Sequence, residues 1–310
     1  MANKTRKKTR ITGNVILVLC MMLPGFLYLI FNNFIPMYGI TIAFKDLDFS
    51  LNNVFASPWC GVENFKFLFE SDAIWVYVKN TVLYNLAFMI INIVVPVTMA
   101  ILFTNVLGKI KGVYQTLILL PHLMSWVVIS YIVFAFLSGE NGLLNALIVK
   151  NGGERMNFYG EEAIGMWPFI LVFFNTWKGV GYSFLFYYAS IIAIDASLYE
   201  AAKLDGANYW QQVKNITLPC LKPIIIMMFI MALAGIVRSD YGLFFLLPKN
   251  SGQLYDVTQT IDTFIFNALK GNGDLVQSSA ASVLQSLVGF VLILGANVLL
   301  RKIDKENALF

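Results

Sequence analysis

The chain has 310 residues, of which 58% are hydrophobic and only 13% are charged, and its 22 basic and 18 acidic side chains give a net charge of +4. Because an average soluble domain has roughly 25% charged residues, this composition excludes an ordinary water-soluble enzyme or binding module and indicates an all-helical membrane protein. The positive excess lies in the N-terminal head and in loops beside apolar runs, where anionic lipid attracts it. It gives no reason to expect a nucleic-acid partner.

Six segments are apolar and long enough to cross a bilayer, which takes about 20 residues each. Their approximate bounds are 13–38, 76–104, 112–137, 164–190, 219–247 and 280–301. No Gly/Ser-rich linker divides the chain, so we expect one compact helical bundle as a single domain over 13–310. The connection 39–75 is expected to hold a short extended piece and an interfacial helix. The connection 138–163 is expected to hold a small helix around Leu143–Val149.

A basic head occupies residues 1–12 and contains the run KTRKKTR. A cleaved signal peptide is the alternative reading of this head and the apolar run behind it. The run from Val15 to Phe31 is longer than the usual 7–15-residue core of a signal peptide, and no small-x-small cleavage site follows it. We therefore expect an uncleaved membrane anchor.

The distribution of Lys and Arg predicts the orientation of the spans. With six spans both ends lie on one side, and that side carries about 13 of the 22 basic residues. The opposite loops carry about seven basic but about twelve acidic residues. We expect a multi-pass protein of the bacterial cell membrane with both termini, and the loop between the fourth and fifth spans, in the cytoplasm.

That loop contains the polar stretch EAAKLDGANYWQQVKNITLP, residues 200–219. Ser197 and Glu200 have the spacing of a capping box and predict a helix start, and Gly206 after Asp205 predicts its end. Asn208 can cap a second short helix before Pro219 opens the fifth span. The sequence therefore predicts two small helices outside the membrane.

Two functions are open for such a loop. It can be an interfacial amphipathic helix that only connects two spans, or a docking segment for another protein. Ala201 and Ala202 favour docking, because they leave a nearly bare backbone face on which the cleft of a partner can close.

The spacing Glu200-Ala201-Ala202, three residues, Gly206, nine residues, then Ile216-x-Leu218-Pro219 resembles the EAA loop of the membrane subunits of binding-protein-dependent ABC importers. In that family the loop is the coupling helix that sits in a groove of the ATPase subunit. The resemblance implies an ATPase-coupling loop over about 195–219. The residues that carry it are Glu200, Ala201, Ala202, Asp205, Gly206, Ile216, Leu218 and Pro219.

Further segments resemble the sugar-permease branch of these importers: PMYGITIAFKDLD (36–48), SPWCGVENF (57–65), LPHLMSWVV (120–128), SDYGLF (239–244), TIDTFIF (260–266) and SVLQSLVGFVL (282–292). The resemblance implies the type I ABC importer fold with six transmembrane helices. It also implies four kinds of partner: a second permease in a heterodimer, an ATPase dimer, an extracytoplasmic solute-binding protein and an oligosaccharide.

The chain shows no catalytic machinery of its own. It lacks the G-x-x-x-x-G-K-[ST] phosphate loop, so ATP and Mg are expected on partner subunits and no cofactor on this chain. Its one histidine, His122, follows Pro121 in an apolar span and has no second metal ligand near it in sequence, which leaves a metal site unsupported. The pair Asp46 and Asp48 matches the DxD of glycosyltransferases, but a solvated outer loop explains so short a match.

Ionisable residues inside a span are functional candidates by default. Lys178 lies near the middle of the fourth span. It can snorkel, pair with a carbonyl of a neighbouring helix or line the substrate path. With Trp177, Tyr182 and Tyr187 it forms the tentative sugar path.

Arg238 and Asp240 are the second candidate pair. At about 1.5 Å per residue, Arg238 is expected roughly 28 Å above Pro219, near the outer boundary of the membrane. A local ion pair at a helix end is the alternative to a place on the sugar path.

The resemblance and the missing phosphate loop together predict a non-enzymatic permease subunit that imports a sugar or complex oligosaccharide. Two alternatives belong to other classes: a multi-span membrane enzyme of glycan or lipid metabolism, and a secondary carrier. The inverted repeat of many secondary carriers is not visible in the sequence.

Overall fold

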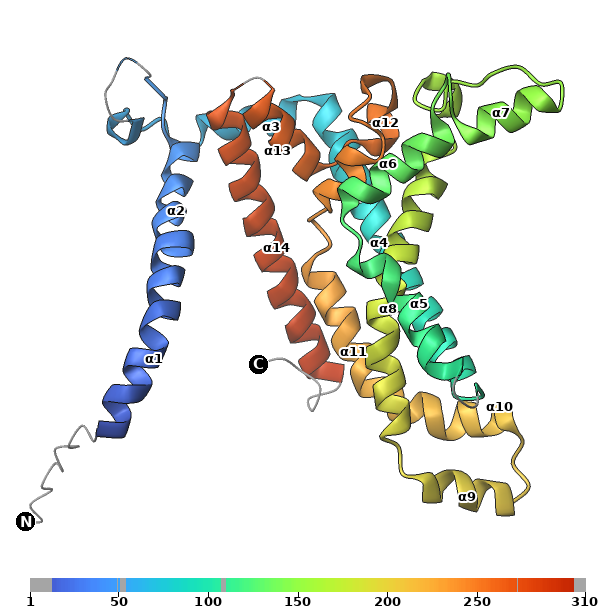
Figure 1. Ribbon diagram of the computed structural model, residues 1–310. Helices are drawn as coiled ribbons and strands as arrows, with labels where there is room; N and C mark the ends of the chain where they lie inside the picture. Colours follow the sequence, from blue (N-terminus) through green and yellow to red (C-terminus); the bar gives the residue numbers. More distant parts are fainter. Residues whose placement is uncertain (1–12, 49, 51–53, 107–109, 272, 304–310) are drawn as a thin grey trace, which may run out of the picture.

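The computed structural model describes residues 13–48, 50, 54–106, 110–271 and 273–303 (Figure 1). The predicted basic head at 1–12 lies outside these residues. Within the described ranges the fold is helical and contains no strand, and one isolated antiparallel bridge pairs Lys45 with Trp59. This agrees with the predicted all-helical class.

The α-helices are α1 (Gly13–Leu29), α2 (Ile35–Met37), α3 (Lys66–Glu70), α4 (Asp72–Phe103), α5 (Ile110–Leu123), α6 (Trp126–Leu137), α7 (Leu143–Lys150), α8 (Trp167–Ile192), α9 (Ala196–Leu204), α10 (Tyr209–Gln212), α11 (Leu218–Ala234), α12 (Tyr255–Thr258), α13 (Ile261–Lys270) and α14 (Leu275–Ile303). Shorter 3-10 or π turns are η1 (Ile30–Phe34), η2 (Tyr38–Phe44), η3 (Val54–Ala56), η4 (Glu63–Phe65), η5 (Glu161–Ala163), η6 (Val213–Thr217), η7 (Gly242–Leu246) and η8 (Gly252–Leu254). The predicted helix near Leu143–Val149 is α7.

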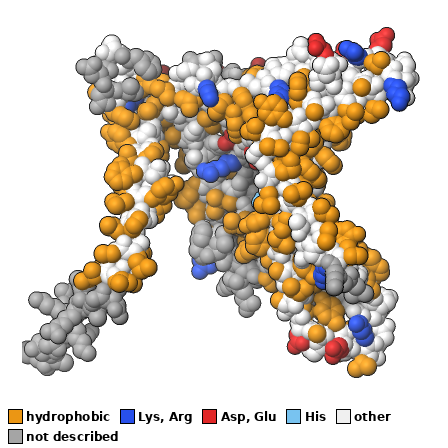
Figure 2. All heavy atoms as spheres, viewed as in Figure 1, with side chains coloured by type: hydrophobic (Ala, Val, Ile, Leu, Met, Phe, Trp, Pro, Cys, Tyr) orange, Lys and Arg blue, Asp and Glu red, His pale blue; other side chains and the backbone are white. Residues whose placement is uncertain are grey.

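Five described helices are long and apolar enough to span a membrane, and a sharply bent pair supplies a sixth candidate. The single helices cover Ile16–Phe44, Asp72–Phe103, Trp167–Ile192, Tyr209–Ala234 and Leu275–Val298. Apolar side chains cover the middle of the molecule, and charged ones gather near α7 at one end and near α9 and α10 at the other (Figure 2). The number of spans matches the prediction.

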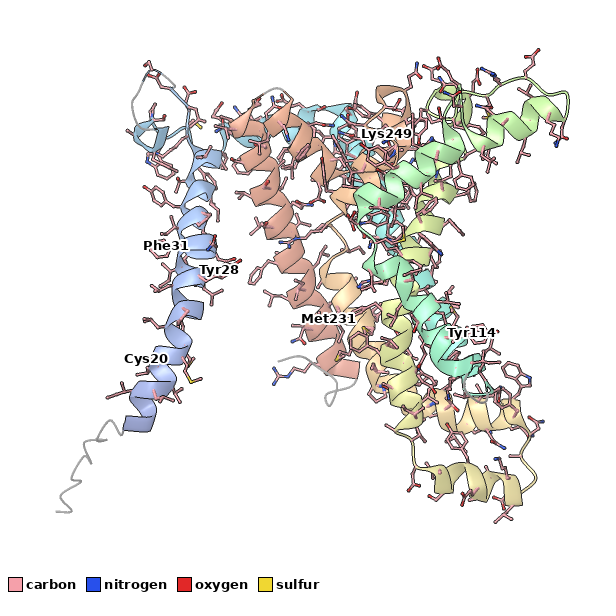
Figure 3. All side chains as sticks on the ribbon, viewed as in Figure 1. Cys20, Tyr28, Phe31, Tyr114, Met231 and Lys249 are labelled. Atoms are coloured by element: carbon pink, nitrogen blue, oxygen red, sulfur yellow. The ribbon has the colours of Figure 1, made fainter. Side chains whose placement is uncertain are left out.

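The first span stands apart from the other helices (Figure 1). It runs from α1 through η1 and α2 into η2, and only η2 packs against another span, α14. Cys20, Tyr28 and Phe31 project from it without reaching another helix (Figure 3), and Tyr28 and Phe31 are 65% and 62% exposed. The first span therefore presents an apolar surface that no described part of this chain covers.

The third predicted span, 112–137, is two helices rather than one. α5 and α6 meet at 92°. Pro121 lies in the last turn of α5, where its missing amide weakens the helix. Ser125 then starts α6, because its hydroxyl accepts a hydrogen bond from the Val128 amide at 3.3 Å.

The fifth predicted span, 219–247, differs from the structure at both ends. Its helix begins earlier, at Tyr209, and α11 ends at Ala234. A turn and an extended piece follow from Gly235 to Asp240, and the chain then enters η7. The helix can stop inside the apolar run because Asn85 of α4 and Gln285 of α14 donate hydrogen bonds to the backbone carbonyls that the helix no longer satisfies.

Two cores hold the bundle together. The core toward the α7 end centres on Trp167 and Leu171 of α8 and on Tyr84 and Phe88 of α4, with Phe244 of η7 packed against them. The second, toward α9, is formed by side chains from α4, α8 and the α10–α11 helix: Val97, Ala100, Phe103, Phe184, Tyr188 and Leu221. Together the two cores fix α4 and α8 side by side along their length.

Candidate functional site

The loop after α8 forms a separate helix, α9, that begins two residues earlier than its capping signal suggests. The N-cap is Asp195, whose carboxylate accepts the Ser197 amide at 2.9 Å. The predicted capping box of Ser197 with Glu200 is therefore wrong, because Asp195 already occupies the cap. The hydrogen bond from the Ser197 amide lowers the pKa of Asp195 from its ordinary value, so the cap is ionised at neutral pH.

α9 ends where the sequence predicts. The Ala207 amide reaches back to the Ala202 carbonyl at 2.9 Å, and Gly206 has a φ of +79°, in the left-handed region that glycine adopts without cost. Asn208 then caps α10 in a capping box with Gln211, with bonds of 2.9 and 2.7 Å. The predicted glycine stop and the predicted Asn208 cap are both confirmed.

α10 does not end before the fifth span. The helix runs on through the π turn η6 into α11, so that Tyr209–Ala234 is one helix of 26 residues. Ile216, Leu218 and Pro219 lie inside this helix, and Pro219 lies just after the π turn η6, where the helical hydrogen-bond pattern changes. Of the two short helices predicted in this loop, only α9 is separate from the spans, which corrects the prediction.

α9 offers an open surface. None of its residues is buried, and Glu200, Ala201, Asp205 and Gly206 are all exposed, whereas Ala202 is half-buried. Leu198, Ala201 and Leu204 recur every third residue along the helix, and Leu204 is 90% exposed. We call Leu198, Glu200, Ala201 and Leu204 the α9 surface. It combines apolar groups with a carboxylate, and all four residues are exposed.

Two tyrosines tie this loop to the spans. The Tyr199 hydroxyl lies 2.9 Å from the Thr217 hydroxyl, and the Tyr209 hydroxyl donates to the Ile101 carbonyl at the end of α4 at 3.0 Å. A cavity of about 620 Å³ lies between α9, α10 and the ends of α4 and α8. α9 is therefore linked to the fifth span by the Tyr199–Thr217 hydrogen bond, and the start of that span is linked to α4 by the Tyr209–Ile101 bond.

Lys178 of α8 fills the break between α5 and α6. Its ammonium donates to the His122 carbonyl at 2.9 Å and to the Met124 carbonyl at 2.6 Å, and it lies 5.4 Å from the centre of the Trp126 ring. Carbonyls at the end of a helix lack intrahelical partners, and inside a membrane no water replaces them. Lys178 therefore pairs with backbone carbonyls of a neighbouring helix, which is one of the three arrangements that the sequence leaves open.

The other aromatic residues expected on the sugar path lie on different sides of α8. Tyr182 stacks on His122 with ring centres 4.9 Å apart, and Trp177 packs against Phe174. Tyr187 is 1% exposed and faces a cavity between α4, α8 and α11. The structure therefore does not bring Trp177, Lys178, Tyr182 and Tyr187 to one surface.

We call the cavity at Tyr187 the polar cavity. It has a volume of about 340 Å³ and is lined mainly from α4, α8 and α11, including Met231 (Figure 3). Its polar side chains are Asn85, Asn92, Asn175, Ser183 and Tyr187. The Asn92 amide donates to the Asn175 carbonyl oxygen at 3.0 Å, and the Tyr187 hydroxyl has no hydrogen-bond partner in the described chain.

Sequence analysis missed these asparagines. Asn85 and Asn92 are seven residues apart, which puts them on one face of α4 in an otherwise apolar span. Asn175 and Ser183 are eight apart on α8 and share a face in the same way. The periodic spacing of polar residues within two apolar spans was the available signal for the cavity.

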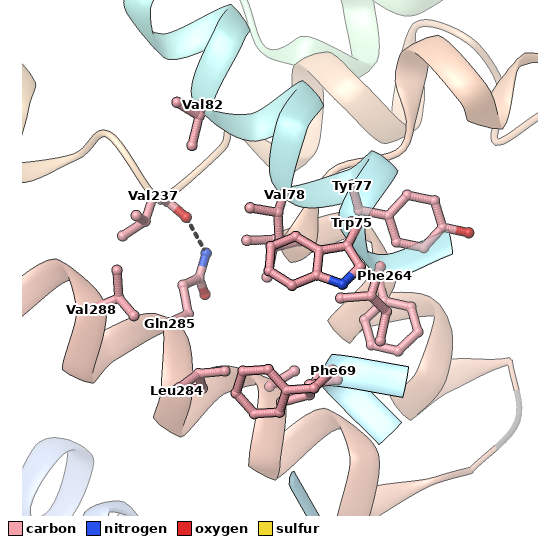
Figure 4. A pocket seen from close by; sticks show the side chains of 14 residues that line it. Phe69, Trp75, Tyr77, Val78, Val82, Val237, Phe264, Leu284, Gln285 and Val288 are labelled. Atoms are coloured by element: carbon pink, nitrogen blue, oxygen red, sulfur yellow. Dashed lines mark hydrogen bonds between the residues drawn. The ribbon is translucent and has the colours of Figure 1, made fainter. Parts of the chain in front are cut away.

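At one edge of the polar cavity the fifth span breaks. The Asn85 amide donates to the carbonyls of Ile236 (3.0 Å) and Arg238 (2.7 Å), and the Gln285 amide donates to the Val237 carbonyl, the bond drawn in Figure 4. Gln285 stands at the edge of an apolar pocket of about 230 Å³ between α4, α13 and α14. Side chains of two other spans thus replace the lost helical hydrogen bonds.

The carboxylates near the break bind neutral donors. Asp262 accepts the Ser239 amide at 2.6 Å and the Gln285 amide at 3.0 Å. Asp240 accepts the Trp126 indole N–H at 2.6 Å and the Gly242 amide at 2.7 Å. The structure does not pair Arg238 with Asp240, the arrangement that the sequence offered as an alternative.

The backbone of Arg238 lies alongside α4 and α14. Its carbonyl is bonded by Asn85, 13 residues into α4, and the carbonyl of Val237 is bonded by Gln285, 10 residues into α14. At about 1.5 Å per residue these positions are roughly 15–20 Å from the first residues of the two helices. The chain reaches this place after α11 has ended at Ala234.

The part of the chain that the structure describes contains no group of three or more His, Cys, Asp or Glu side chains placed to hold a metal ion. The His122 ring stacks on Tyr182, and its carbonyl accepts a hydrogen bond from Lys178.

The chain is similar to permeases over nearly its whole length. YteP, the polygalacturonan/rhamnogalacturonan transport system permease protein of Bacillus subtilis (strain 168), is 34% identical over 288 residues, which cover 93% of this chain and 88% of the relative. Protein LplB of the same organism is 29% identical over 288 residues, which cover 93% of this chain and 89% of the relative. No family model matches the sequence.

Solved structures give the same fold. A chain of a bacterial ABC transporter involved in the import of the acidic polysaccharide alginate superposes with a TM-score of 0.82 at 28% identity, covering 94% of this chain and 97% of that one. A chain of a bacterial alginate ABC transporter in complex with an alginate pentasaccharide-bound periplasmic protein superposes with a TM-score of 0.81 at 28% identity, covering 94% and 96%. The fold, the EAA spacing on α9 and the relative at 34% identity agree: this chain belongs to the sugar-transport permease proteins of the ABC transporters.

Proposed function

We propose that the chain is one of two permease subunits of an ATP-driven importer, which moves an oligosaccharide from an extracytoplasmic binding protein into the cytoplasm. The observation that carries the proposal is the exposed α9 surface, on a helix that is also hydrogen-bonded to the fifth span through Tyr199 and Thr217. In this proposal ATP and Mg bind separate ATPase subunits, and this chain supplies only the docking helix and half of the path.

The proposed orientation places α9 in the cytoplasm of a bacterial cell and α7 outside. Two features support it. The start of α1, the end of α14 and the whole of α9 lie at one end of the molecule (Figure 1), and basic residues predominate in the segments that the sequence assigns to this side. Residues 13–310 would then form a single permease domain, with the basic head at 1–12 and both termini in the cytoplasm.

The proposed second permease accounts for the first span. A span surrounded by lipid alone is tolerable, but an apolar helix held away from its own bundle also provides a surface against which another subunit can pack. The relatives whose names mention a transport system, and the solved complex that includes a periplasmic protein, support the remaining partners.

The sugar path is proposed to follow the polar cavity. Its neutral amides and hydroxyls suit sugar hydroxyls, and Tyr187 adds an unpaired hydroxyl on a buried side chain. Trp177, Lys178 and Tyr182, expected on the path from the sequence, lie on neighbouring faces of α8. Arg238 and Asp240 belong to the broken segment at the cavity edge.

Substitution of one exposed glutamate tests the coupling role. Glu200→Ala should leave the chain in the membrane but lower ATP hydrolysis stimulated by the loaded binding protein, or weaken co-purification of the ATPase. The reason is that the substitution removes the carboxylate that a basic group of the ATPase is proposed to bind. Glu161→Ala, an exposed glutamate in the loop before α8, is the matched control and should change neither value. Normal stimulation and normal co-purification with Glu200→Ala would count against docking through α9.

A further inference from the structure

We infer that α7 lies in the surface of the membrane, with its leucines at the boundary between lipid headgroups and acyl chains, and that phospholipid is the partner of this helix. The inference goes beyond the proposed function and holds whatever sugar the importer carries. It follows from the two unlike faces of α7 and the returning segment 151–158, which together we call the α7 hairpin.

One side of α7 is apolar and open. Leu143 and Leu147 lie one turn apart on the same face and are 50% and 47% exposed. Leu144 and Val149 are exposed beside them, and the one charged residue of the helix is Lys150, in its last turn. A helix of eight residues between two spans thus exposes four large apolar side chains.

The opposite side of α7 is closed by its own chain. Asn145 is two residues from both leucines, which turns it to the other side of the helix, and it is 1% exposed. Its amide donates to the Met156 carbonyl at 2.8 Å, and its oxygen accepts the Met156 amide at 2.9 Å. The returning segment then exposes Glu154 and Arg155. The α7 hairpin therefore has a leucine face and a charged face on opposite sides.

The two faces have a fixed direction relative to the spans. The returning segment runs along the side of α7 that points away from the spans (Figure 1). Acidic and basic side chains lie along the top edge of the molecule over the hairpin, with apolar side chains below them (Figure 2). The leucine face is therefore turned toward the layer that lipid occupies, and the charged face toward water.

The hairpin is also fixed at the depth of the membrane boundary. The Asn145 amide donates to the carbonyls of Ser138 and Gly139, at 3.2 and 3.1 Å, directly after the end of α6. Near that end the Lys249 ammonium lies 4.5 Å from the centre of the Tyr131 ring. Tyrosine is enriched where a span meets water, and lysine extends its ammonium toward headgroups there. An amphipathic helix binds a bilayer at this same boundary.

Charge distinguishes lipid from a protein partner on the leucine face. Lys150 follows Leu147 by three residues, so both lie on one face, and phospholipid phosphate supplies an anion beside the acyl chains. Lysine can keep its apolar stem along the lipid while its ammonium reaches the phosphate. The exposed carboxylate of Glu154 lies on the other side of the hairpin, where it does not repel the phosphates.

Photo-cross-linking in the complete importer tests this inference. The importer is placed in nanodiscs of phosphatidylethanolamine and phosphatidylglycerol, together with the loaded binding protein, and p-benzoylphenylalanine replaces Leu147. Mass spectrometry should find phospholipid joined to this position, with a yield at least about tenfold above that for the same probe at Glu154, because only the apolar face of an interfacial helix meets acyl chains. Leu143 should behave as Leu147, and Arg155 as Glu154.

Each of the other outcomes would overturn the inference. Cross-links from Leu147 to the binding protein or to the second permease would make the leucine face a protein contact. Equal lipid yields at Leu147 and Glu154 would mean that the hairpin has no membrane face, and no adduct at either leucine would place both in water. None of these results bears on ATP-driven uptake, which the same nanodisc preparation reports separately through ATP hydrolysis stimulated by the loaded binding protein.

Discussion

Several polar side chains within the spans of this permease donate hydrogen bonds to backbone carbonyls. Lys178 binds two carbonyls at the end of α5, Asn85 binds two in the broken fifth span, and Gln285 binds one between them. Each replaces a helical hydrogen bond at a point where the bilayer offers no water. These side chains therefore allow irregular backbone to exist inside the membrane.

Lys178→Met should destabilise the chain rather than change which sugar it carries. The substitution keeps the length of the side chain but leaves the carbonyls of His122 and Met124 without a donor, at a cost of about 1–3 kcal/mol for each buried group. The expected result is a lower midpoint of thermal unfolding for the purified complex. Uptake per folded complex should keep the wild-type preference between acidic and neutral trisaccharides, and a changed preference at unchanged stability would refute this role.

Sequence alone located Lys178 as unusual but left three explanations for it. The carbonyl pairing could not be predicted, because it depends on where α5 ends and on the approach of α5 to α8. The opposite holds for Gly206 and Asn208, whose roles are local: a left-handed turn and a cap within four residues. Local backbone chemistry was predictable, and contacts between distant segments were not.

For the spans too, local features were predictable from the sequence and contacts between distant segments were not. Hydropathy predicted their number and approximate places, because burying about 20 apolar residues is a property of each segment alone. It failed on the bend of 92° between α5 and α6 and on the end of α11, because both depend on side chains supplied by other spans. The close packing of α5 on α8 is one such contact.

Gly181 and Gly179 test that packing as a matched pair on α8. A Cβ at Gly181 would overlap the backbone of Ile118 and Leu119 in α5, whereas a Cβ at Gly179 would meet only the Asn92 side chain, at 4.0 Å. Gly181→Ala should therefore destabilise the complex by roughly 1–3 kcal/mol, and Gly179→Ala should have little effect. Thermal unfolding of both variants measures this, and equal midpoints would show that α5 can move away without cost.

At the scale of the whole molecule, the fifth span connects the exposed α9 surface to the buried polar cavity. Tyr199 of α9 is hydrogen-bonded to Thr217 of the fifth span, and the helix of that span ends at the break beside the polar cavity. The sequence predicted the first of these sites through the EAA spacing. It did not predict the second, whose residues come mainly from α4, α8 and α11.

Tyr199→Phe isolates the link between α9 and the fifth span. Loss of the hydroxyl removes one hydrogen bond, worth about 1 kcal/mol, while the ring and the exposed α9 surface remain. Co-purification with the ATPase should stay normal, and ATP hydrolysis stimulated by the loaded binding protein should fall roughly two- to fivefold relative to the basal rate. Tyr114→Phe, an exposed tyrosine of α5, is the control; equal stimulation in both variants would exclude a role for the link.

The continuous helix from Tyr209 to Ala234 joins the attachment of α9 to the break in the fifth span. Its 26 residues correspond to a length of about 39 Å. The Tyr209 hydroxyl bonds one end to α4, and Thr217, which bonds Tyr199 of α9, lies roughly 12 Å along the helix. In the proposed importer, a displacement of α9 by the ATPase would therefore reach the segment that holds Arg238 through a single helix, about 26 Å from Thr217 to Ala234.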